Sequence, residues 1–201
     1  MANHGAWHLA ENPNVYEPMR NNTFELIVTG LGELIKPGAA TTEDNVAIDG
    51  SDVLDGTWAQ EVIRFAVNKV TIPNYEQSVI NINRGNTQVK FAGTMTYGEG
   101  SIEVIDYIGA DAKSVLMAWQ KLSGDIKNET VGYARDYKKD CYLIEYGPDF
   151  KEVRHWEIKG AWVASVSNDE NSNEGGNDKR VLTGRLIFDK AILMDPDFIE
   201  E

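Results

Sequence analysis

The chain has 201 residues, enough for one domain whose hydrophobic core needs neither disulfides nor metal ions for support. It carries 19 lysines and arginines against 32 aspartates and glutamates, and the resulting formal net charge of −13 disfavours a protein that clamps a nucleic-acid backbone. Hydrophobic residues make up 42% of the chain, including five Trp, eight Tyr and six Phe, so we expect a folded protein rather than a disordered acidic one.

The single cysteine, Cys141, excludes an intramolecular disulfide and a zinc site built from several thiolates. The N-terminal residues lack a basic start followed by an apolar run, and no stretch reaches the roughly 18 apolar residues of a membrane span. We therefore expect a soluble protein made in the cytoplasm.

The first part of the chain predicts an arm, a strand and an insertion. Residues 1–22 are polar and show no hydrophobic period, so they predict an arm that becomes ordered only when something packs on it. Residues 23–31 alternate apolar and polar side chains, as a half-buried strand does. Residues 32–60 contain several glycines, Pro37 and an acidic run, which indicates a long surface insertion.

A strand and a long hairpin are predicted next. Residues 61–72 are rich in Val, Ile and Phe and predict a strand that Pro73 interrupts. Residues 77–83 and 88–97 alternate, and between them lies a turn that favours a hairpin tip, formed by Arg84, Gly85 and Asn86. One side of this ribbon is apolar, and a long two-stranded ribbon is marginally stable alone, so we expect something to cover it.

One helix is predicted in the second half of the chain, after a strand over residues 101–108. The helix covers residues 112–123, between Asp111, which suits the N-cap, and Gly124, which suits a left-handed C-terminal position. Its apolar face is expected to close the open side of a sheet and consists of Ala112, Val115, Leu116, Trp119 and Leu122.

The remaining residues predict three strands and an acidic loop. Residues 140–146 and 152–166 are expected to pair as a hairpin through the turn formed by residues 147–149. Residues 167–179 form an acidic loop rich in Gly and Asn, and residues 181–193 alternate as a closing strand.

Together these elements predict one domain over residues 23–195, followed by a C-terminal tail over residues 196–201. Seven or eight strands with one helix between the fifth and the sixth predict a mainly β fold. We expect an antiparallel β-sandwich or barrel with one α-helix and a long β-hairpin. The absence of alternating strands and helices in the sequence pattern excludes a doubly wound sheet.

Candidate catalytic and metal-binding residues are few. His4 and His8 are four residues apart with Glu11 behind them, but an N-terminal arm is a poor scaffold for a metal site. His155 is expected to be an ordinary strand residue and Cys141 a buried small hydrophobe. The abundant carboxylates leave a pair for glycoside hydrolysis as the enzymatic alternative. We predict no catalytic, metal or cofactor site, and therefore no enzyme.

The order of several motifs goes beyond composition. The helical residues 111–122 precede the sequence Tyr-Lys-Lys at 137–139 and a strand over 153–162 that contains a Lys-Gly-Ala-Trp step. Upstream, residues 67–73 lead into the long ribbon. This order resembles that of the tail tube proteins of contractile-tailed bacteriophages, which are related to type VI secretion and pyocin tube subunits. The resemblance covers roughly residues 60–195 and excludes the arm, the insertion and the acidic loop.

The resemblance implies a structural virion protein of the phage tail. Its hexameric rings would join their sheets into one inner barrel and stack into a hollow tube through which DNA is ejected. The implied partners are further copies of the chain and the tail sheath, baseplate, tape measure and tail terminator proteins. Six copies of −13 amount to −78 formal charges, and a negative channel wall would repel DNA. The candidate acids for the wall or an interface are Asp169, Glu170 and Glu174.

The resemblance also assigns roles to single residues. The hairpin tip at Arg84, Gly85 and Asn86 is expected to take part in ring stacking. Trp119 is expected in the core, and Trp162 in the core or at a subunit contact. The alternatives are a baseplate tube or type VI-like tube subunit, a monomeric β-sandwich binding module, and the carboxylate-dependent glycosidase.

Overall fold

The computed structural model describes residues 19–32, 58–107, 112–168 and 179–194. Residues 1–18 of the predicted arm, residues 33–57 of the insertion, residues 169–178 of the acidic loop and the tail lie outside the described residues. The strands are β1 Phe24–Val28, β2 Val67–Val70, β3 Tyr75–Arg84, β4 Thr87–Tyr97, β5 Gly100–Ile105, β6 Gly124–Asp125, β7 Thr130–Val131, β8 Lys139–Tyr146, β9 Glu152–Asn168, β10 Val181–Ile187 and β11 Lys190–Met194. The helices are α3 Trp58–Ala66, α4 Ala112–Ser123 and α5 Ala134–Tyr137.

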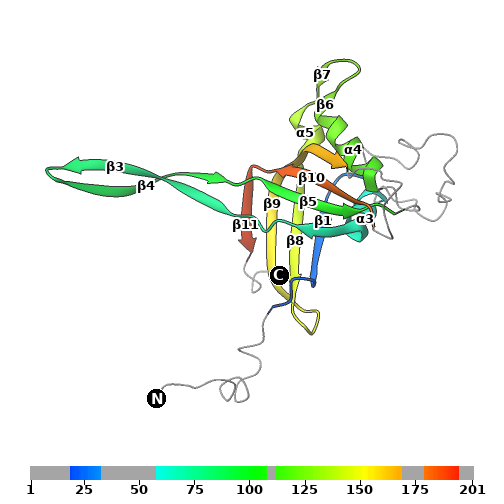
Figure 1. The fold of residues 1–201 in the computed structure, drawn as a ribbon, viewed down its shortest axis with the longest axis horizontal. Helices are drawn as coiled ribbons and strands as arrows, with labels where there is room; N and C mark the ends of the chain where they lie inside the picture. The colour runs from blue at the N-terminus through cyan, green and yellow to red at the C-terminus, as the bar shows by residue number, and fades with distance from the viewer. Residues whose placement is uncertain (1–18, 33–57, 108–111, 169–178, 195–201) are drawn as a thin grey trace, which may run out of the picture.

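Seven strands form one bent and open antiparallel sheet (Figure 1). Their order is β1-β8-β9-β10-β5-β2, and β11 also pairs with β9. The N-terminal part of β9, up to Ala161, pairs with β8 and β11, whereas its C-terminal part pairs with β10. We call β1, β8, β11 and the first part of β9 the first layer, and the rest of β9 with β10, β5 and β2 the second layer. The predicted antiparallel β-sandwich is confirmed, with an unclosed sheet.

The bend in β9 occurs at Gly160. This residue has a φ of +67°, a conformation that glycine adopts without the steric cost that a Cβ atom imposes. A side chain here would also collide with the Asp189 carboxylate. The Gly160 N–H donates to Asp140 Oδ1 at 3.2 Å, and the Asp189 N–H donates to the Lys159 carbonyl at 3.1 Å. The Lys-Gly-Ala step of the sequence is therefore the corner between the two layers.

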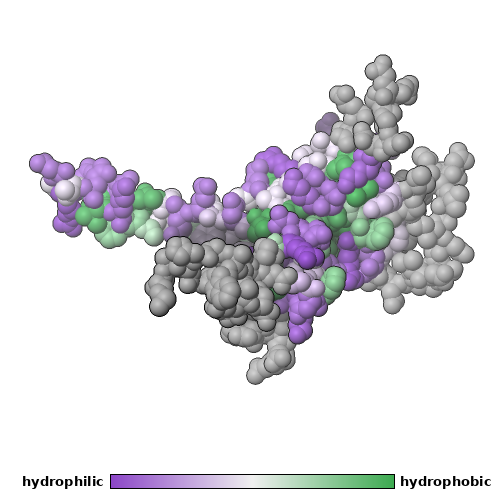
Figure 2. All heavy atoms as spheres, turned by 60° about the horizontal axis from the view of Figure 1, so that its bottom comes forward, coloured by the Kyte–Doolittle hydropathy of each residue, from purple (hydrophilic) through white to green (hydrophobic). Residues whose placement is uncertain are grey.

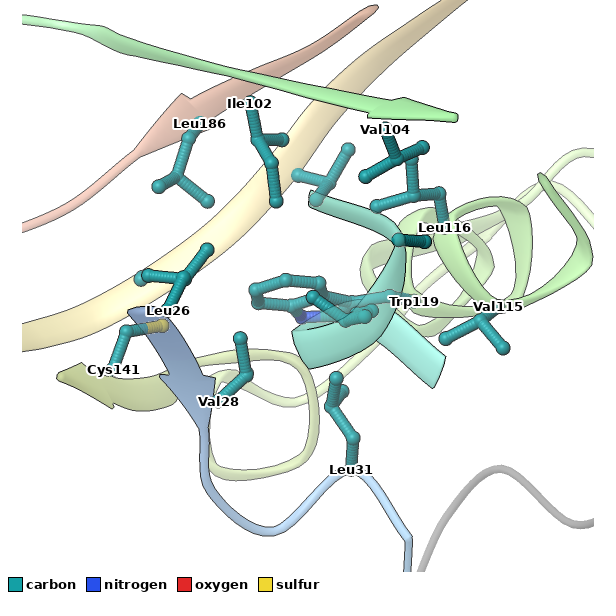
Figure 3. Packing of buried hydrophobic residues seen from close by; sticks show 14 of the residues in the cluster. Leu26, Val28, Leu31, Ile102, Val104, Val115, Leu116, Trp119, Cys141 and Leu186 are labelled. Atoms are coloured by element: carbon teal, nitrogen blue, oxygen red, sulfur yellow. The ribbon is translucent and has the colours of Figure 1, made fainter. Parts of the chain in front are cut away.

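The helix predicted over residues 112–123 is confirmed as α4, which packs into the hydrophobic core between the layers. Val115 and Leu116 are fully buried, Trp119 is 1% exposed, and Leu122 is partly buried against the same cluster. In Figure 3 the Trp119 indole lies in the middle of the cluster, among residues of α4 and β1. Its Nε1 donates to the Tyr137 carbonyl at 2.9 Å, so the one polar atom of the indole is satisfied.

The prediction of a strand over residues 61–72 is wrong, because Trp58–Ala66 is the helix α3 and β2 is limited to Val67–Val70. The buried residues of α3 lie three, four and seven positions after the first of them, which is the spacing of one helical face. They are Ala59, Val62, Ile63 and Ala66. The β-branched residues suggested a strand, but their spacing favours a helix that buries this face in the core.

Four further details differ from the predictions. The closing strand is split into β10 and β11 at Phe188, where the chain crosses from the second layer to the first. Gly124 does not take the left-handed conformation, because it begins β6 and pairs with Val131 of β7. The short helix α5 follows. Trp162, predicted in the core or at a subunit contact, is half-buried outside the core cluster, with its ring edge-on to Tyr137 at 5.5 Å between centroids, so only the core alternative is wrong and a subunit contact stays a prediction.

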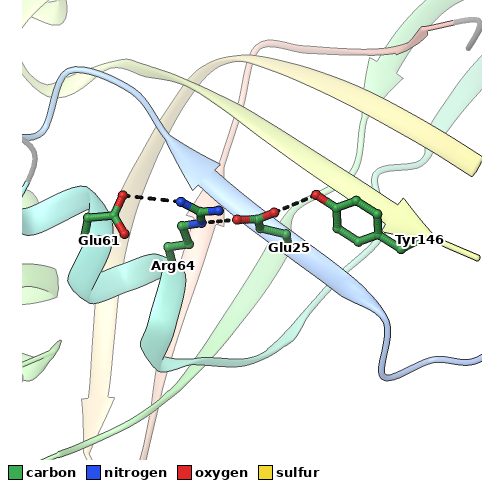
Figure 4. Close-up of polar contacts among 4 residues, drawn as sticks. All are labelled: Glu25, Glu61, Arg64 and Tyr146. Atoms are coloured by element: carbon green, nitrogen blue, oxygen red, sulfur yellow. Dashed lines mark hydrogen bonds and ion pairs between the residues drawn. The ribbon is translucent and has the colours of Figure 1, made fainter. Parts of the chain in front are cut away.

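A polar network attaches α3 to the edge of the first layer (Figure 4). Arg64 of α3 donates to Glu25 of β1 and lies 3.4 Å from Glu61. The Tyr146 hydroxyl of β8 donates to the other Glu25 oxygen at 2.7 Å. Burial and this hydrogen bond to Glu25 raise the pKa of Tyr146 to about 12, because both disfavour the phenolate.

We expect Trp119→Ala to lower the free energy of unfolding by about 3–5 kcal/mol, because it leaves a large cavity in the core. Urea denaturation of the unassembled subunit measures this loss. Met117→Ala is the matched control on the same helix, since Met117 is 49% exposed and its loss costs little. Equal losses from the two substitutions would contradict the assigned packing of α4.

Tyr146→Phe tests the polar network through the pH dependence of stability. The pKa of Tyr146 is higher in the folded chain than in the unfolded chain, where it is about 10. The protonated hydroxyl therefore contributes stability below pH 10 that is lost as the pH rises towards 12. The stability difference between wild type and Tyr146→Phe, measured by denaturation across this pH range, should shrink steadily. A constant difference would count against the network.

Candidate functional site

The hairpin of β3 and β4 projects away from the two layers (Figure 1). The strands pair with each other and with no third strand of the described residues. Every residue of β3 is exposed, and so are most residues of β4. An isolated two-stranded ribbon in water is only marginally stable. We therefore expect another chain to cover this hairpin.

One face of the hairpin is apolar. Ile80 lies opposite Phe91, and Ile82 opposite Val89, so their four side chains share a face. Ile80 and Phe91 are each 52% exposed, which is unusual for adjacent large hydrophobic side chains. Figure 2 shows hydrophobic residues gathered on the projecting hairpin. We call Ile80, Ile82, Val89 and Phe91 the apolar face of the hairpin.

The opposite face of the hairpin is polar near the tip and becomes apolar towards the base, where Val79 pairs with Ala92. It carries the pairs Asn81 with Lys90 and Asn83 with Gln88. The ribbon is therefore amphipathic, with one face suited to water and the other to burial.

The predicted tip residues lie where the sequence placed them. Arg84 pairs with Thr87, and Gly85 and Asn86 form the two-residue turn between them. Gly85 has a φ of +61°, which a type II′ hairpin turn requires at its first central position. The Thr87 hydroxyl donates to the Arg84 carbonyl at 3.0 Å and stabilises the turn. Apart from its two neighbours in sequence, no atom of the described residues lies within 4 Å of the Cβ position at Gly85, so this part of the chain makes no contact there.

The second layer has two edges that are hydrogen-bonded on one side. In the described residues β2 pairs with β5, and β9 beyond Trp162 pairs with β10. Because each step from β2 to β9 is antiparallel, these two edge strands run in opposite directions. The β2 edge of one copy could therefore extend the ladder antiparallel to the β9 edge of another copy.

The second layer also has a polar outer face, opposite the core. Two polar registered rows cross it, and the apolar pair of Ile105 and Val181 continues the same face beside them. One row consists of Lys69, Glu103, Thr183 and Ser167. The other row consists of Ser101, Arg185 and Ser165, and Thr71 hydrogen-bonds to Ser101 at its end. We call these eight residues the outer face of the second layer. Five of them carry hydroxyl groups, and no described helix or strand packs on them.

The remaining candidate residues from the sequence lie outside the described residues or away from the hairpin and the second layer. Asp169, Glu170, Glu174, His4 and His8 lie outside the described residues. Cys141 is fully buried, and burial raises the pKa of its thiol far above the ordinary value.

His155 lies half-buried on β9, edge-on to the Tyr142 ring. In the described part of the chain no three His, Cys, Asp or Glu side chains gather as a metal site requires. None of the described helices is long and apolar enough to cross a membrane.

The sequence predicts the hairpin and its tip, but it does not predict the edges or the outer face of the second layer. The hairpin has a local signal, because two alternating runs flank a glycine-containing turn. The pairing of β2, β5, β10 and β9 joins segments far apart in the sequence, and no local pattern specifies it. The alternation of polar and apolar residues in residues 181–187 was the available signal for an outward-facing polar row.

The sequence is similar to that of known tail tube proteins, although no protein-family model matches it. It is 27% identical over 106 residues to tail tube protein gp19 of Enterobacteria phage T4, and the same holds for gp19 of phage T6. The match covers 52% of this chain and 65% of gp19, just under two thirds of the relative's length.

The fold is similar to that of chains in two solved structures of an extracellular contractile injection system. The first is the PVC sheath–tube complex in its extended state, with a TM-score of 0.57, 13% identity, and coverage of 96% of this chain and 99% of the other. The second is the PVC sheath/tube terminator, with a TM-score of 0.59, 16% identity, and coverage of 90% and 99%. The chain is thus homologous over half of its length to phage tail tube protein gp19 and shares a fold with chains of contractile injection systems.

Proposed function

We propose that this chain is the structural subunit of a phage tail tube, in which hexameric rings stack into a hollow tube for DNA ejection. The observation that carries the proposal is the homology to gp19 together with a projecting hairpin whose apolar face is uncovered. A monomeric β-sandwich binding module would have no need for such a hairpin. A baseplate tube or a type VI-like tube subunit would use the same surfaces and is the closest alternative.

The hairpin is the proposed ring-stacking element. Its apolar face has no partner within the described part of its own chain, and its tip at Arg84, Gly85 and Asn86 lies furthest from the two layers. A subunit of the neighbouring ring is the proposed partner, because stacking identical rings offers every hairpin an equivalent surface. Burial of the four apolar side chains would then stabilise each ring-to-ring contact.

The edges of the second layer are the proposed lateral contacts within a ring. When the β2 edge of one copy pairs with the β9 edge of the next, every copy uses the same two edges. The contact can therefore repeat from copy to copy until the ring closes. Closure satisfies the backbone groups of both edges, which would otherwise invite uncontrolled association. The count of six follows the family resemblance, and a chain of similar fold occurs in an anti-feeding prophage baseplate described as 6-fold symmetrised.

Several partners belong to the proposal. Chains of similar fold occur in complexes described as sheath–tube, sheath/tube terminator and baseplate. We include a tail sheath, a terminator and a baseplate as partners of this chain, and a tape measure protein inside the tube. The chain would be made in the host cytoplasm and would end in the virion tail.

A structural role is favoured over glycoside hydrolysis. The homologous proteins are named as tail tube proteins, which supports a role without catalysis. Several carboxylates of the described residues are engaged by basic side chains, including Glu25, Glu99, Glu103 and Glu145. The hydrogen bond from Arg185 lowers the pKa of Glu99, which makes this carboxylate a poor general acid.

Negative-stain electron microscopy of the purified full chain tests the proposal directly. We expect rings or tubes with a central hole, whose amount rises with protein concentration. A strict monomer at high concentration would contradict a tube subunit and favour the binding module.

The hairpin provides the sharper test of stacking. Ile80→Lys and Phe91→Lys place charges on the apolar face, and we expect at least a tenfold loss of tube length by microscopy, because a buried unpaired charge is costly. The melting temperature of the subunit should change little, since this face packs on no other described residues of its own chain. Asn81→Lys and Gln88→Lys on the polar face are the matched controls. Equal loss from controls and test variants would contradict the assigned stacking face.

A further inference from the structure

The outer face of the second layer has the arrangement expected of a channel wall, an assignment that rests on the proposed tube. Ring closure through β2 and β9 places four strands of each copy side by side in one continuous wall. The core, the first layer and α4 all lie on the other side of this sheet, where Ile102, Val104 and Leu182 are buried. A ring has room for that bulk only on its outside, so the outer face turns towards the axis.

This face is polar and nearly neutral rather than acidic. Thr71 and Ser101 bond to each other at 2.8 Å, and Ser165, Ser167 and Thr183 add exposed hydroxyl groups. Lys69 and Arg185 are the basic residues among the eight that define it. DNA contacts in proteins depend chiefly on Lys and Arg that neutralise phosphates, so these two side chains decide whether DNA sticks to the wall.

Both cations are occupied by carboxylates of the neighbouring strand or turn. Arg185 binds Glu99 through two nitrogens, with its Nε donating to Oε2 at 2.7 Å and its other bond joining Nη2 to Oε1. The fork uses two of the five N–H donors of the guanidinium and holds a carboxylate charge against it, which weakens its attraction for a phosphate. Lys69 Nζ lies 3.2 Å from Glu103 Oε1. The pairing lowers the pKa of Glu99 and raises that of Arg185, which keeps both groups charged.

A third basic residue lies at the end of the same layer. Lys179 reaches Asn68 of β2, with 3.1 Å between its Nζ and the carboxamide oxygen. An amide leaves the charge of Lys179 in place, so residual attraction for DNA at this end of the second layer should come from Lys179.

We infer that Glu99 and Glu103 mask Arg185 and Lys69 from DNA phosphates, so that the wall of the tube offers passing DNA no free cation on this face. Masking differs from general repulsion. Repulsion depends on the net charge of the whole assembly and weakens with salt, whereas masking depends on two particular contacts. A phosphate that binds this wall must first displace a carboxylate already in place.

The experiment neutralises the two carboxylates that pair with the cations and keeps both cations in place. Glu99→Gln with Glu103→Gln leaves Arg185 and Lys69 without their carboxylates on the wall. We expect this double variant to bind a fluorescein-labelled single-stranded DNA of about 20 nucleotides at least tenfold more tightly than wild type, both as tubes and as unassembled subunits. The gain should disappear between about 50 and 200 mM salt. Adding Arg185→Gln and Lys69→Gln should return binding to the wild-type level.

The matched control is Asp136→Asn with Asp149→Asn. These carboxylates pair with Arg135 and Lys151 at 3.5 and 3.6 Å, away from the outer face, so the change in net charge is identical. The control should leave DNA binding within about twofold of wild type. An equal gain in the control would overturn the inference, because net charge alone would then explain binding.

The subunit and tube measurements separate this inference from the proposed function. If wild type forms no tubes, the proposed function fails, and a gain in unassembled subunits still supports masking by Glu99 and Glu103. If tubes form and the subunits gain DNA affinity while the tubes do not, the outer face does not line an accessible channel and the inference is wrong. No gain in either form also overturns it.

Discussion

One strand, β9, belongs to both layers of the sheet, and the conformation of Gly160 allows it to do so. The positive φ turns the chain between the part paired with β8 and the part paired with β10. The Asp189 carboxylate occupies the space of a side chain at this corner and also binds Lys138. A residue with a Cβ atom would strain the backbone and displace that carboxylate. The core, the two edges and the outer face all depend on this bend.

The bend produces a subunit with a densely packed core and with exposed surfaces that are not covered by its own described residues. Between the layers, α3 and α4 complete a dense core around Trp119. Outside it, the apolar face of the hairpin has no partner in the described part of the chain, and the two edges of the second layer have no further strand partner there, although Gln120 of α4 donates to the Ala164 carbonyl of β9 at 3.2 Å. A folded chain that leaves such groups exposed gains free energy by association with its own copies.

The sequence predicts best what is encoded locally. The turn at Gly85 and the spacing of Val115, Leu116 and Trp119 each occupy a short segment, and the structure places them as the pattern predicts. The helix α3 was misread because Val62, Ile63 and Phe65 favour strands by type, while helical spacing determined the outcome. The pairing of Arg185 with Glu99 joins residues 86 positions apart, and only the registers of β5 and β10 bring them together.

In the folded chain the positions of the charges matter as well as their sum. As a sum, −13 excludes a DNA clamp and suggests a repelling wall. On the outer face of the second layer, however, the carboxylates are matched to the cations beside them, so the placement of the charges matters more than their sum. Net charge then serves the colloidal stability of a large assembly, while individual pairs control contact with the cargo.

A cryo-electron microscopy reconstruction of assembled tubes tests the central claim most directly. The account predicts a continuous wall formed by β2, β5, β10 and β9 of every copy, with Thr183 and Ser165 facing the channel. It also predicts that Phe91 is buried against the neighbouring ring. A tube whose channel is lined by the first layer, or whose hairpins project freely into solvent, would contradict it.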